Sequence, residues 1–377
     1  MKKINVITYL AERNRGSEFE VGILAERYLG SLRGRIFMPA FQFYRYNGRA
    51  RKINSVIFKQ TAGLRVIVKI GSALKEPSTP NQFRIGFVLW LFKCRFLLRN
   101  LNGIYWFVTL AQLLSPAPII FIGKKYVLGP AGGQAKFWQF SYLKPSLRIK
   151  NFLLREIFYP LYLLFVDHNS IVFCHPSLAK NNYKVIPAIH QIPKKNFIQS
   201  IKDKNSIIFV GRKMEIKMTD CVYEIFAKLS IMYPKYNFKI IGEGWESAKI
   251  SPNFEIYSGL SRVKVQNIFK TSILHVFLSF ELAGFVLFEA VKNGCPNFTL
   301  QGFGSDYLVS PSEPFKVSPN VNSKDELAKN AVKKIAYILN NKHLLKNESK
   351  RQYSRSLNFT IDSKFLSINS VLTDRVN

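Results

Sequence analysis

Short apolar runs and amphipathic stretches alternate along the second half of the chain, and their spacing predicts alternating strands and helices. The series begins with the apolar run 206–210, which ends at Gly211. It continues with strands at 238–241, 254–257 and 274–278, helices at 220–232 and 261–270, and a helix over 289–293 that Gly294 closes. Such alternation is typical of a parallel sheet covered by helices.

The first half shows the same alternation in a less regular form. A strand at 4–9 is followed by a polar loop at 12–18 and a helix at 19–28, the order that opens a doubly wound sheet. Further strands are predicted at 35–38, 55–58, 66–69, 119–122, 126–128 and 169–174, and further helices at 83–99 and 146–165.

The two series predict two α/β domains, each built on a doubly wound sheet. A length of 377 residues favours two domains over one, and residues 187–205 are polar, as a linker would be. We predict an N-terminal domain over 1–187, a C-terminal domain over 188–355, and a segment over 356–377 that packs back on the first domain.

Residues 100–123 carry no charge and are long enough to cross a bilayer. Prolines at 116 and 118 interrupt them, and Asn100, Asn102 and Gln112 lie among the apolar residues. We therefore predict a buried helix at 104–114, a turn and a strand at 119–122, with a membrane span as the alternative.

The charge of the chain indicates an anionic partner. Lys and Arg number 55 against 23 Asp and Glu, which gives a net charge of +32. Nucleotide phosphates, nucleic acid and an anionic membrane leaflet all fit this excess. The predicted helix 83–99 combines a wide apolar face with Arg84, Lys93, Arg95 and Arg99. It suits a lipid headgroup interface, and it equally suits a core helix whose cations reach outward.

Two glutamates mark a candidate site at the end of the predicted strand 274–278. Glu281 and Glu289 have seven residues between them, and Glu289 opens the predicted helix 289–293. Ligands of open α/β sheets bind at the carboxyl ends of the strands, where these carboxylates fall. The alternative is a surface acid and an acid that complements the dipole of the helix.

Cations follow the first strand of the second series. Gly211 and Arg212 come directly after it, and Lys217 lies five residues beyond Arg212. A guanidinium fork and a mobile ammonium suit a diphosphate, although two solvated surface cations are the plainer interpretation.

The first half offers two glycine-containing loops at predicted strand ends. Arg13, Arg15 and Gly16 lie in the first, and Gly132 and Gly133 in the second. Both could line a ligand cleft, or be a solvated loop and a plain turn. No H-E-x-x-H, D-x-D or Walker motif is present, and the four cysteines form no C-x2-C pair, so we expect neither a metal site nor a disulfide framework.

The order G-R-x4-K, I-G-x-G, E-x7-E and G-x-P over 205–300 resembles the donor-binding domain of the family 4 retaining glycosyltransferases. The resemblance implies a GT-B fold, with two Rossmann-like doubly wound domains facing a cleft. It implies that Arg212 and Lys217 bind the donor diphosphate, Glu281 the transferred sugar and Glu289 the ribose. Gly211, Gly284, Phe285 and Gly16 would complete the donor site, and Arg13, Arg15, Gly132 and Gly133 would line the acceptor side.

The chain departs from the family where Leu282-Ala283-Gly284 replaces Gly-Phe-Gly and where Asn297-Phe298-Thr299 replaces an aliphatic strand. A positive φ at position 282 would strain Leu282.

The resemblance implies a metal-independent retaining glycosyltransferase that needs no cofactor. Its donor would be a UDP- or GDP-sugar and its acceptor a glycan, often polyprenyl-linked, in bacterial surface polysaccharide synthesis. We expect a cytoplasmic protein held peripherally on the anionic inner face of the membrane, with no nucleic acid bound. The alternatives are a basic nucleic-acid-binding protein without enzymatic activity, and a phosphorylase or epimerase on the same scaffold.

Overall fold

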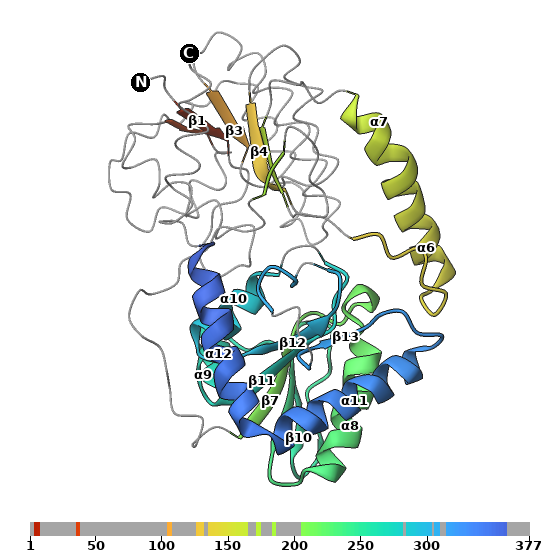
Figure 1. The fold of residues 1–377 in the computed structure, drawn as a ribbon, viewed down its shortest axis with the longest axis vertical. Helices are drawn as coiled ribbons and strands as arrows, with labels where there is room; N and C mark the ends of the chain where they lie inside the picture. The colour runs from red at the N-terminus through yellow and green to blue at the C-terminus, as the bar shows by residue number, and fades with distance from the viewer. Residues whose placement is uncertain are drawn as a thin grey trace, which may run out of the picture. The chain divides into compact units, whose positions relative to one another are not determined.

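A computed structural model describes residues 4–7, 35–37, 104–107, 126–131, 135–164, 171–174, 183–185, 205–281, 284–303, 305–309 and 314–359 of the chain. Its contacts divide into two compact units (Figure 1). The first comprises residues 1–132, 156–190 and 361–377, and the second comprises 133–155 and 191–360. The units differ from the predicted domain limits chiefly in residues 133–155, which belong to the second unit although they precede the linker in sequence.

The first unit contains a parallel sheet in the order β2-β1-β3-β4-β5-β6. Its strands are β1 (Ile4–Ile7), β2 (Arg35–Phe37), β3 (Ile104–Phe107), β4 (Tyr126–Ala131), β5 (Ile171–Cys174) and β6 (Tyr183–Val185). Aromatic residues dominate the described core, and the indole N–H of Trp106 donates to the carbonyl of Gly129 over 2.9 Å. A parallel sheet agrees with the α/β fold class predicted from the sequence, whereas the order of its strands was not predicted.

The predicted helix at 104–114 is wrong over 104–107, which form the strand β3 between β1 and β4. Periodicity cannot separate a short buried strand from a buried helix, and Ile-Tyr-Trp-Phe favours a strand through its β-branched and aromatic side chains. Residues 108–125 lie outside the described part, as do the predicted helices 19–28 and 83–99 and the strands 55–58, 66–69 and 119–122. Among the described residues no helix is both long enough and apolar enough to cross a membrane.

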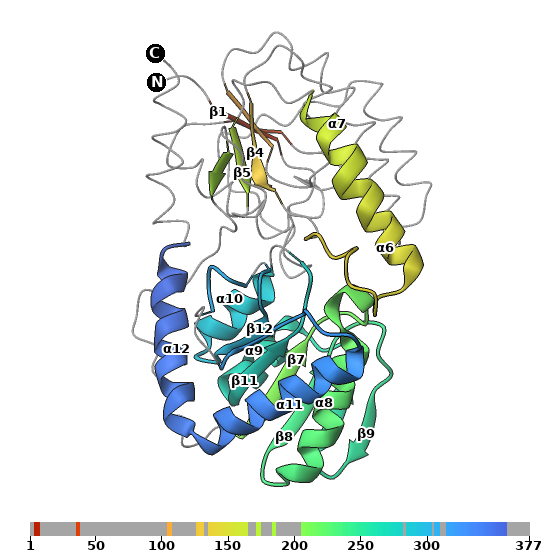
Figure 2. The same cartoon turned by 45° about the vertical axis from the view of Figure 1, so that its right-hand side comes forward.

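The predicted helix 146–165 is confirmed over most of its length. It comprises α6 (Pro145–Phe152), a π-helical stretch (Leu153–Phe158) and α7 (Tyr159–Leu163) (Figure 2). Pro145 begins the helix at a position where its missing N–H costs nothing.

The second unit contains a seven-stranded sheet in the order β13-β12-β11-β7-β8-β10-β9, with only β9 antiparallel to its neighbour. The strands are β7 (Ser206–Val210), β8 (Asn237–Ile241), β9 (Ala248–Ser251), β10 (Phe254–Tyr257), β11 (Ser272–Phe277), β12 (Asn297–Leu300) and β13 (Lys316–Val317). The helices are α8 (Thr219–Met232), α9 (Arg262–Lys270), α10 (Phe285–Lys292), α11 (Lys324–Asn340) and α12 (Lys342–Leu357). Helices α8 and α11 pack on one face, and α9, α10 and α12 lie on the other (Figures 1 and 2). This is a doubly wound α/β layer structure.

One local prediction for the second unit is corrected. Helix α10 begins at Phe285, so Glu289 lies in its second turn and does not open it. The helix includes the apolar residues 285–288. Gly284 is its N-cap and has extended backbone, so the helix begins directly after it. Asn297-Phe298-Thr299 forms the buried strand β12, and the side chain of Asn297 finds partners inside the protein.

A buried polar network joins β11, β12 and α12. The ring of His275 accepts from the N–H of Val210 at Nε2 (3.4 Å), so its Nδ1–H donates to the side-chain oxygen of Asn297 (2.7 Å). Gln352 accepts from the backbone N–H of Asn297 (2.8 Å) and donates to its carbonyl (3.0 Å). Asn297 also donates to the carbonyl of Leu287 (3.1 Å), which ties the network to α10.

Burial lowers the pKa of His275 from 6.5 to about 4; the hydrogen bond to Asn297 opposes this shift, and the charge of Lys217 adds to it. Since the folded state holds the ring neutral, stability is complete above the unfolded pKa and is lost as pH falls towards the folded one.

We expect the free energy of unfolding to fall by about 2 kcal/mol between pH 7 and pH 5 through this histidine. Urea titrations at the two pH values measure it. His275→Gln removes the titrating group, so its stability should depend less on pH over this interval. An equal loss in both proteins would assign the pH dependence to other groups.

Candidate active site

The candidate site lies at the carboxyl edge of the two central strands of the second unit. Strands β7 and β11 are parallel neighbours, so the segments that follow them, 211–218 and 278–284, leave the sheet at the same edge. Crevices at this edge are where open α/β sheets bind ligands.

Two glycines bring the first of these segments against the segment after β8. Gly211 donates its N–H to the carbonyl of Ile241 over 2.8 Å. A Cβ on Gly242 would stand 2.0 Å from the carbonyl oxygen of Gly211, so position 242 accepts only glycine without a shift of backbone. The indole of Trp245 donates to the same carbonyl oxygen over 3.2 Å and packs against Phe209.

The structure brings together two of the predicted site residues, Lys217 and Glu281. The ammonium of Lys217 lies 3.2 Å from Oε2 of Glu281 and 5.4 Å from the centre of the Phe277 ring. The Lys217 and Glu281 side chains are 12% and 24% exposed, so both are partly shielded and still reachable by a ligand. Arg212 precedes Lys217 by five residues on the same loop, and its side chain is exposed.

The backbone that carries Glu281 is fixed on two sides. Phe280 donates its N–H to the carbonyl of Ile216 (2.9 Å), and its carbonyl accepts from the N–H of Ala135 (3.0 Å). The Phe280 ring is enclosed by Phe137, Phe140 and Phe303, with ring centres 4.9 to 5.4 Å away. Residues 133–155 therefore form part of the wall of this site within the second unit.

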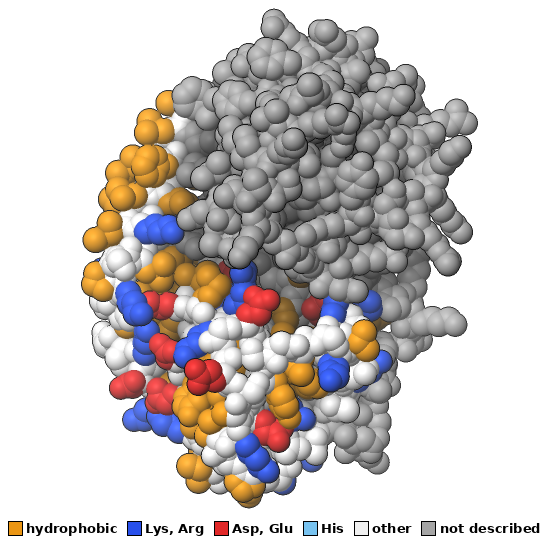
Figure 3. Space-filling view, turned by 180° about the vertical axis from the view of Figure 1, so that it is seen from behind, with side chains coloured by type: hydrophobic (Ala, Val, Ile, Leu, Met, Phe, Trp, Pro, Cys, Tyr) orange, Lys and Arg blue, Asp and Glu red, His pale blue; other side chains and the backbone are white. Residues whose placement is uncertain are grey.

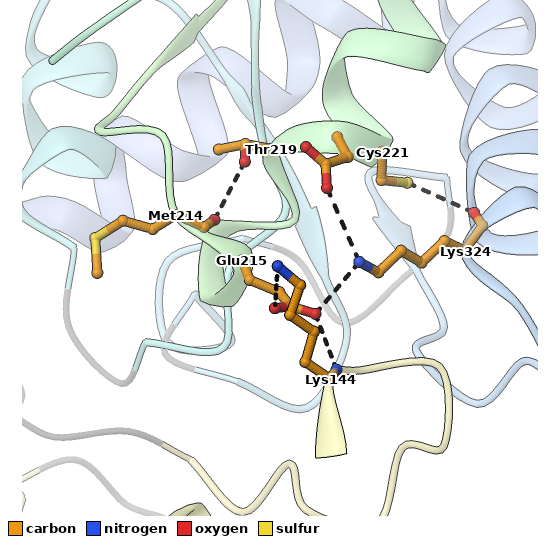
Figure 4. A network of polar contacts seen from close by, with 7 residues as sticks. Lys144, Met214, Glu215, Thr219, Cys221 and Lys324 are labelled. Atoms are coloured by element: carbon orange, nitrogen blue, oxygen red, sulfur yellow. Dashed lines mark hydrogen bonds and ion pairs between the residues drawn. The ribbon is translucent and has the colours of Figure 1, made fainter. Parts of the chain in front are cut away.

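Glu215 anchors the short 3₁₀ turn Glu215–Lys217 at its other end (Figure 4). Its Oε1 accepts from the backbone N–H of Lys144 (2.9 Å) and pairs with the ammonium of Lys324 (3.3 Å). The ammonium of Lys144 lies 3.8 Å from its Oε2. One carboxylate thus joins residues 133–155, the loop that carries Lys217 and the start of α11.

Cys221 lies beside this network without being a nucleophile. Its thiol is buried and contacts the carbonyl of Lys324 over 3.8 Å (Figure 4). Burial raises its pKa to about 12, and the nearby carboxylates of Glu224 and Asp220 add to the shift against the opposing charge of Lys324. A thiol held protonated in this way is unreactive.

The second motif glutamate has a partner that the sequence analysis missed. Oε1 of Glu289 accepts from Arg262, at 2.8 Å from Nη2 and 3.0 Å from Nε. Arg262 is the first residue of α9, directly after the N-cap Ser261. Because α9 follows the parallel strand β10, its start lies at the same sheet edge as the glutamates. The position of Arg262 at the start of a helix that follows a predicted strand could therefore have indicated it as a site residue.

The remaining predicted site residues divide into two groups. Gly284 is buried at the start of α10, where a Cβ would stand 3.3 Å from the Phe277 ring, and Phe285 follows it half-buried. Arg13, Arg15, Gly16, Gly132 and Gly133 lie outside the described residues, as do Leu282 and Ala283. Within the described part of the chain no three His, Cys, Asp or Glu side chains are grouped to hold a metal ion.

Comparison with known proteins agrees with this geometry. Residues 191–355 match the family model "Glycosyl transferases group 1". No curated protein matches the chain in sequence.

Solved structures match nearly the whole chain at low sequence identity. A UDP-forming trehalose-phosphate synthase from Burkholderia xenovorans matches with a TM-score of 0.60 and 10% identity, and the match covers 100% of both chains. HepE from Anabaena, in complex with UDP-glucose, matches with a TM-score of 0.59 and 11% identity over 99% of this chain and 100% of that one. The E. coli trehalose-6-phosphate protein bound to UDP-2-fluoro glucose matches with a TM-score of 0.59 and 12% identity over 98% and 99%.

The family match lies on the unit that contains the site, and the structural matches extend over the chain. Together they support a glycosyltransferase, and they show that this chain has the GT-B fold.

Proposed function

We propose that the chain is a retaining glycosyltransferase that moves a sugar from a nucleotide-diphosphate donor to a glycan or polyprenyl-linked acceptor in bacterial surface polysaccharide synthesis. The observation that carries the proposal is the contact between Lys217 and Glu281 at the carboxyl edge of β7 and β11. It joins the two motifs that the sequence separates by more than sixty residues. The UDP-sugars held by the E. coli and Anabaena structures support a donor of that class.

Lys217 is assigned to the donor diphosphate. An ammonium has three N–H donors, and only one is needed for Glu281. The other two can face phosphate oxygens, while a cation–π contact with the Phe277 ring stabilises the ammonium. A fixed cation beside the departing diphosphate stabilises the negative charge that develops there in the transition state. Arg212, exposed on the same loop, adds a guanidinium fork, and we propose that no metal ion is required.

Glu281 is assigned to the sugar hydroxyls. The ion pair with Lys217 keeps it near the diphosphate end of the donor, and the two hydrogen bonds of Phe280 fix its backbone. A carboxylate held this way orients the sugar and stabilises a cationic, oxocarbenium-like centre. Retention then proceeds on one face of that centre, with no protein nucleophile assigned.

Glu289 is assigned to the ribose, with Arg262 as the residue that positions it. Both Arg262 contacts go to Oε1, and a carboxylate has further acceptor positions, which we assign to the ribose hydroxyls.

Glu281→Ala should lower the rate of transfer about a hundredfold, because one transition-state contact of this kind is worth about 3 kcal/mol. UDP or GDP should still bind within a few-fold of wild type. Release of nucleotide from a panel of UDP- and GDP-sugars, with bacterial membranes as the source of acceptor, measures the rate. The assay is run with and without a chelator to test metal independence. Wild-type turnover in the variant would refute the assignment.

Lys217→Ala should weaken binding of UDP or GDP at least tenfold and leave that of the free nucleoside unchanged, since only the diphosphate carries the complementary charge. Titration calorimetry with each pair of ligands measures both. Lys235→Ala removes an exposed lysine on the same unit and controls for net charge. Equal losses for nucleotide and nucleoside would mean that Lys217 acts on the fold.

Arg262→Ala should weaken UDP or GDP several-fold, because Glu289 loses the group that holds it in place. The loss should be much smaller for the 2′,3′-dideoxy nucleotide, which lacks the ribose hydroxyls. Arg262→Lys should restore part of the affinity, and Lys264→Ala on the same helix is the matched control. A loss that is the same for both nucleotides would contradict the ribose assignment.

A further inference from the structure

The helical residues 145–164 have their polar and apolar faces reversed. Asn151, Arg155 and Tyr159 recur every four residues and are buried. Asn151 accepts from the N–H groups of Phe137 and Trp138 and donates to the carbonyl of Ala135, so its polar side chain has a structural role inside.

The opposite face presents large apolar side chains to the surface. Ile149, Leu153, Ile157 and Leu161 also recur every four residues, Leu164 follows after three, and Phe152 and Phe158 flank this row. We call these seven residues the apolar stripe. They are 38% to 79% exposed.

The apolar stripe is not ordinary surface. Fourteen large apolar side chains are exposed in the described part of the chain, and seven of them belong to the stripe. The other seven are distributed over five elements or loops of the second unit. In the space-filling view a row of orange side chains follows α6 to α7 along the left edge (Figure 3). Single exposed apolar residues need no explanation, but a contiguous patch marks a contact surface.

Cations surround one end of the stripe. Lys144 and Lys150 are exposed just before and within α6, Lys136 is exposed beside Phe137, which is bonded to Asn151, and Arg148 is half-buried. Glu156 is the only acid in residues 135–164. A row of apolar side chains next to cations, on a helix that lies at the surface, is the arrangement that binds in the headgroup region of a bilayer.

We infer that the apolar stripe is a docking surface for an anionic lipid bilayer. The apolar side chains would enter the boundary between headgroups and acyl chains, and the lysines at the start of α6 would contact lipid phosphates. A second copy of the chain fits less well, because each copy carries a net charge of +32 and brings the same cations to the contact. The stripe consists of residues other than the predicted helix 83–99, and its proposed role does not depend on the transfer reaction.

Flotation of the purified chain with vesicles tests the inference. Wild type should float with phosphatidylglycerol vesicles at low salt and much less with phosphatidylcholine vesicles. The variant I157Q/L161Q/L164Q, which keeps every charge, should bind phosphatidylglycerol at least about tenfold more weakly, since three exposed apolar side chains no longer enter the bilayer. The matched control I231Q/M232Q/V263Q alters three apolar residues of 83%, 54% and 67% exposure outside the stripe and should bind as wild type does.

A second charge variant and two checks complete the design. K150Q should weaken binding to phosphatidylglycerol and leave binding to phosphatidylcholine unchanged. Thermal unfolding with UDP- and GDP-sugars, followed without vesicles, verifies that each variant is folded and reports separately on the proposed donor site. Equal flotation of wild type and the stripe variant would overturn the inference, and so would no flotation of wild type. A wild-type dimer in light scattering that the stripe variant abolishes would assign the surface to a second copy instead.

Discussion

The backbone of Phe280 is the point on which the site depends. Its N–H is bonded to Ile216 and its carbonyl to Ala135, so three segments that are far apart in the sequence meet at one residue. Four aromatic rings close around the same position, from residues 137, 140, 280 and 303. Rings packed in this way contribute burial and favourable edge and stacking contacts together. Glu281 follows directly, and its place beside Lys217 is a consequence of that anchoring.

Paired charges then set the electrostatics of the sheet edge. The chain has 23 acidic residues and 55 lysines and arginines. Three of the acidic residues contact a cation near the site. Glu215 holds Lys144 and Lys324, Glu281 contacts Lys217, and Glu289 contacts Arg262. Exposed pairs add little to stability, but pairs fixed at a ligand-binding edge determine where a cation and a carboxylate stand before the ligand arrives. These three carboxylates therefore determine which of the many cations have a fixed position at the sheet edge.

The layer beneath the site is held by neutral polar groups. His275, Asn297 and Gln352 satisfy one another and the backbone of β7, β12 and α10, and none of the three side chains is exposed. Buried polar groups stabilise only when they are fully paired, and a paired network fixes one arrangement of the elements it joins. Since Leu287 belongs to α10, the same network sets the position of Glu289 two residues further along that helix.

The sequence by itself determined the strand and helix order of the second unit, because regular apolar periodicity is a local signal. It also determined the sheet edge at which Lys217, Glu281 and Glu289 fall, since parallel strands end together. It was wrong at 104–107, where four apolar residues fit either a helix or a strand and only pairing with β1 and β4 decides. It misplaced the start of α10, because residues 285–288 carry no capping side chain to mark it. The contact between Lys217 and Glu281, the pairing of Arg262 with Glu289 and the docking of residues 133–155 came from the tertiary structure alone. Each joins residues at least 27 positions apart, and no local pattern encodes the direction in which a side chain meets a partner so far along the chain.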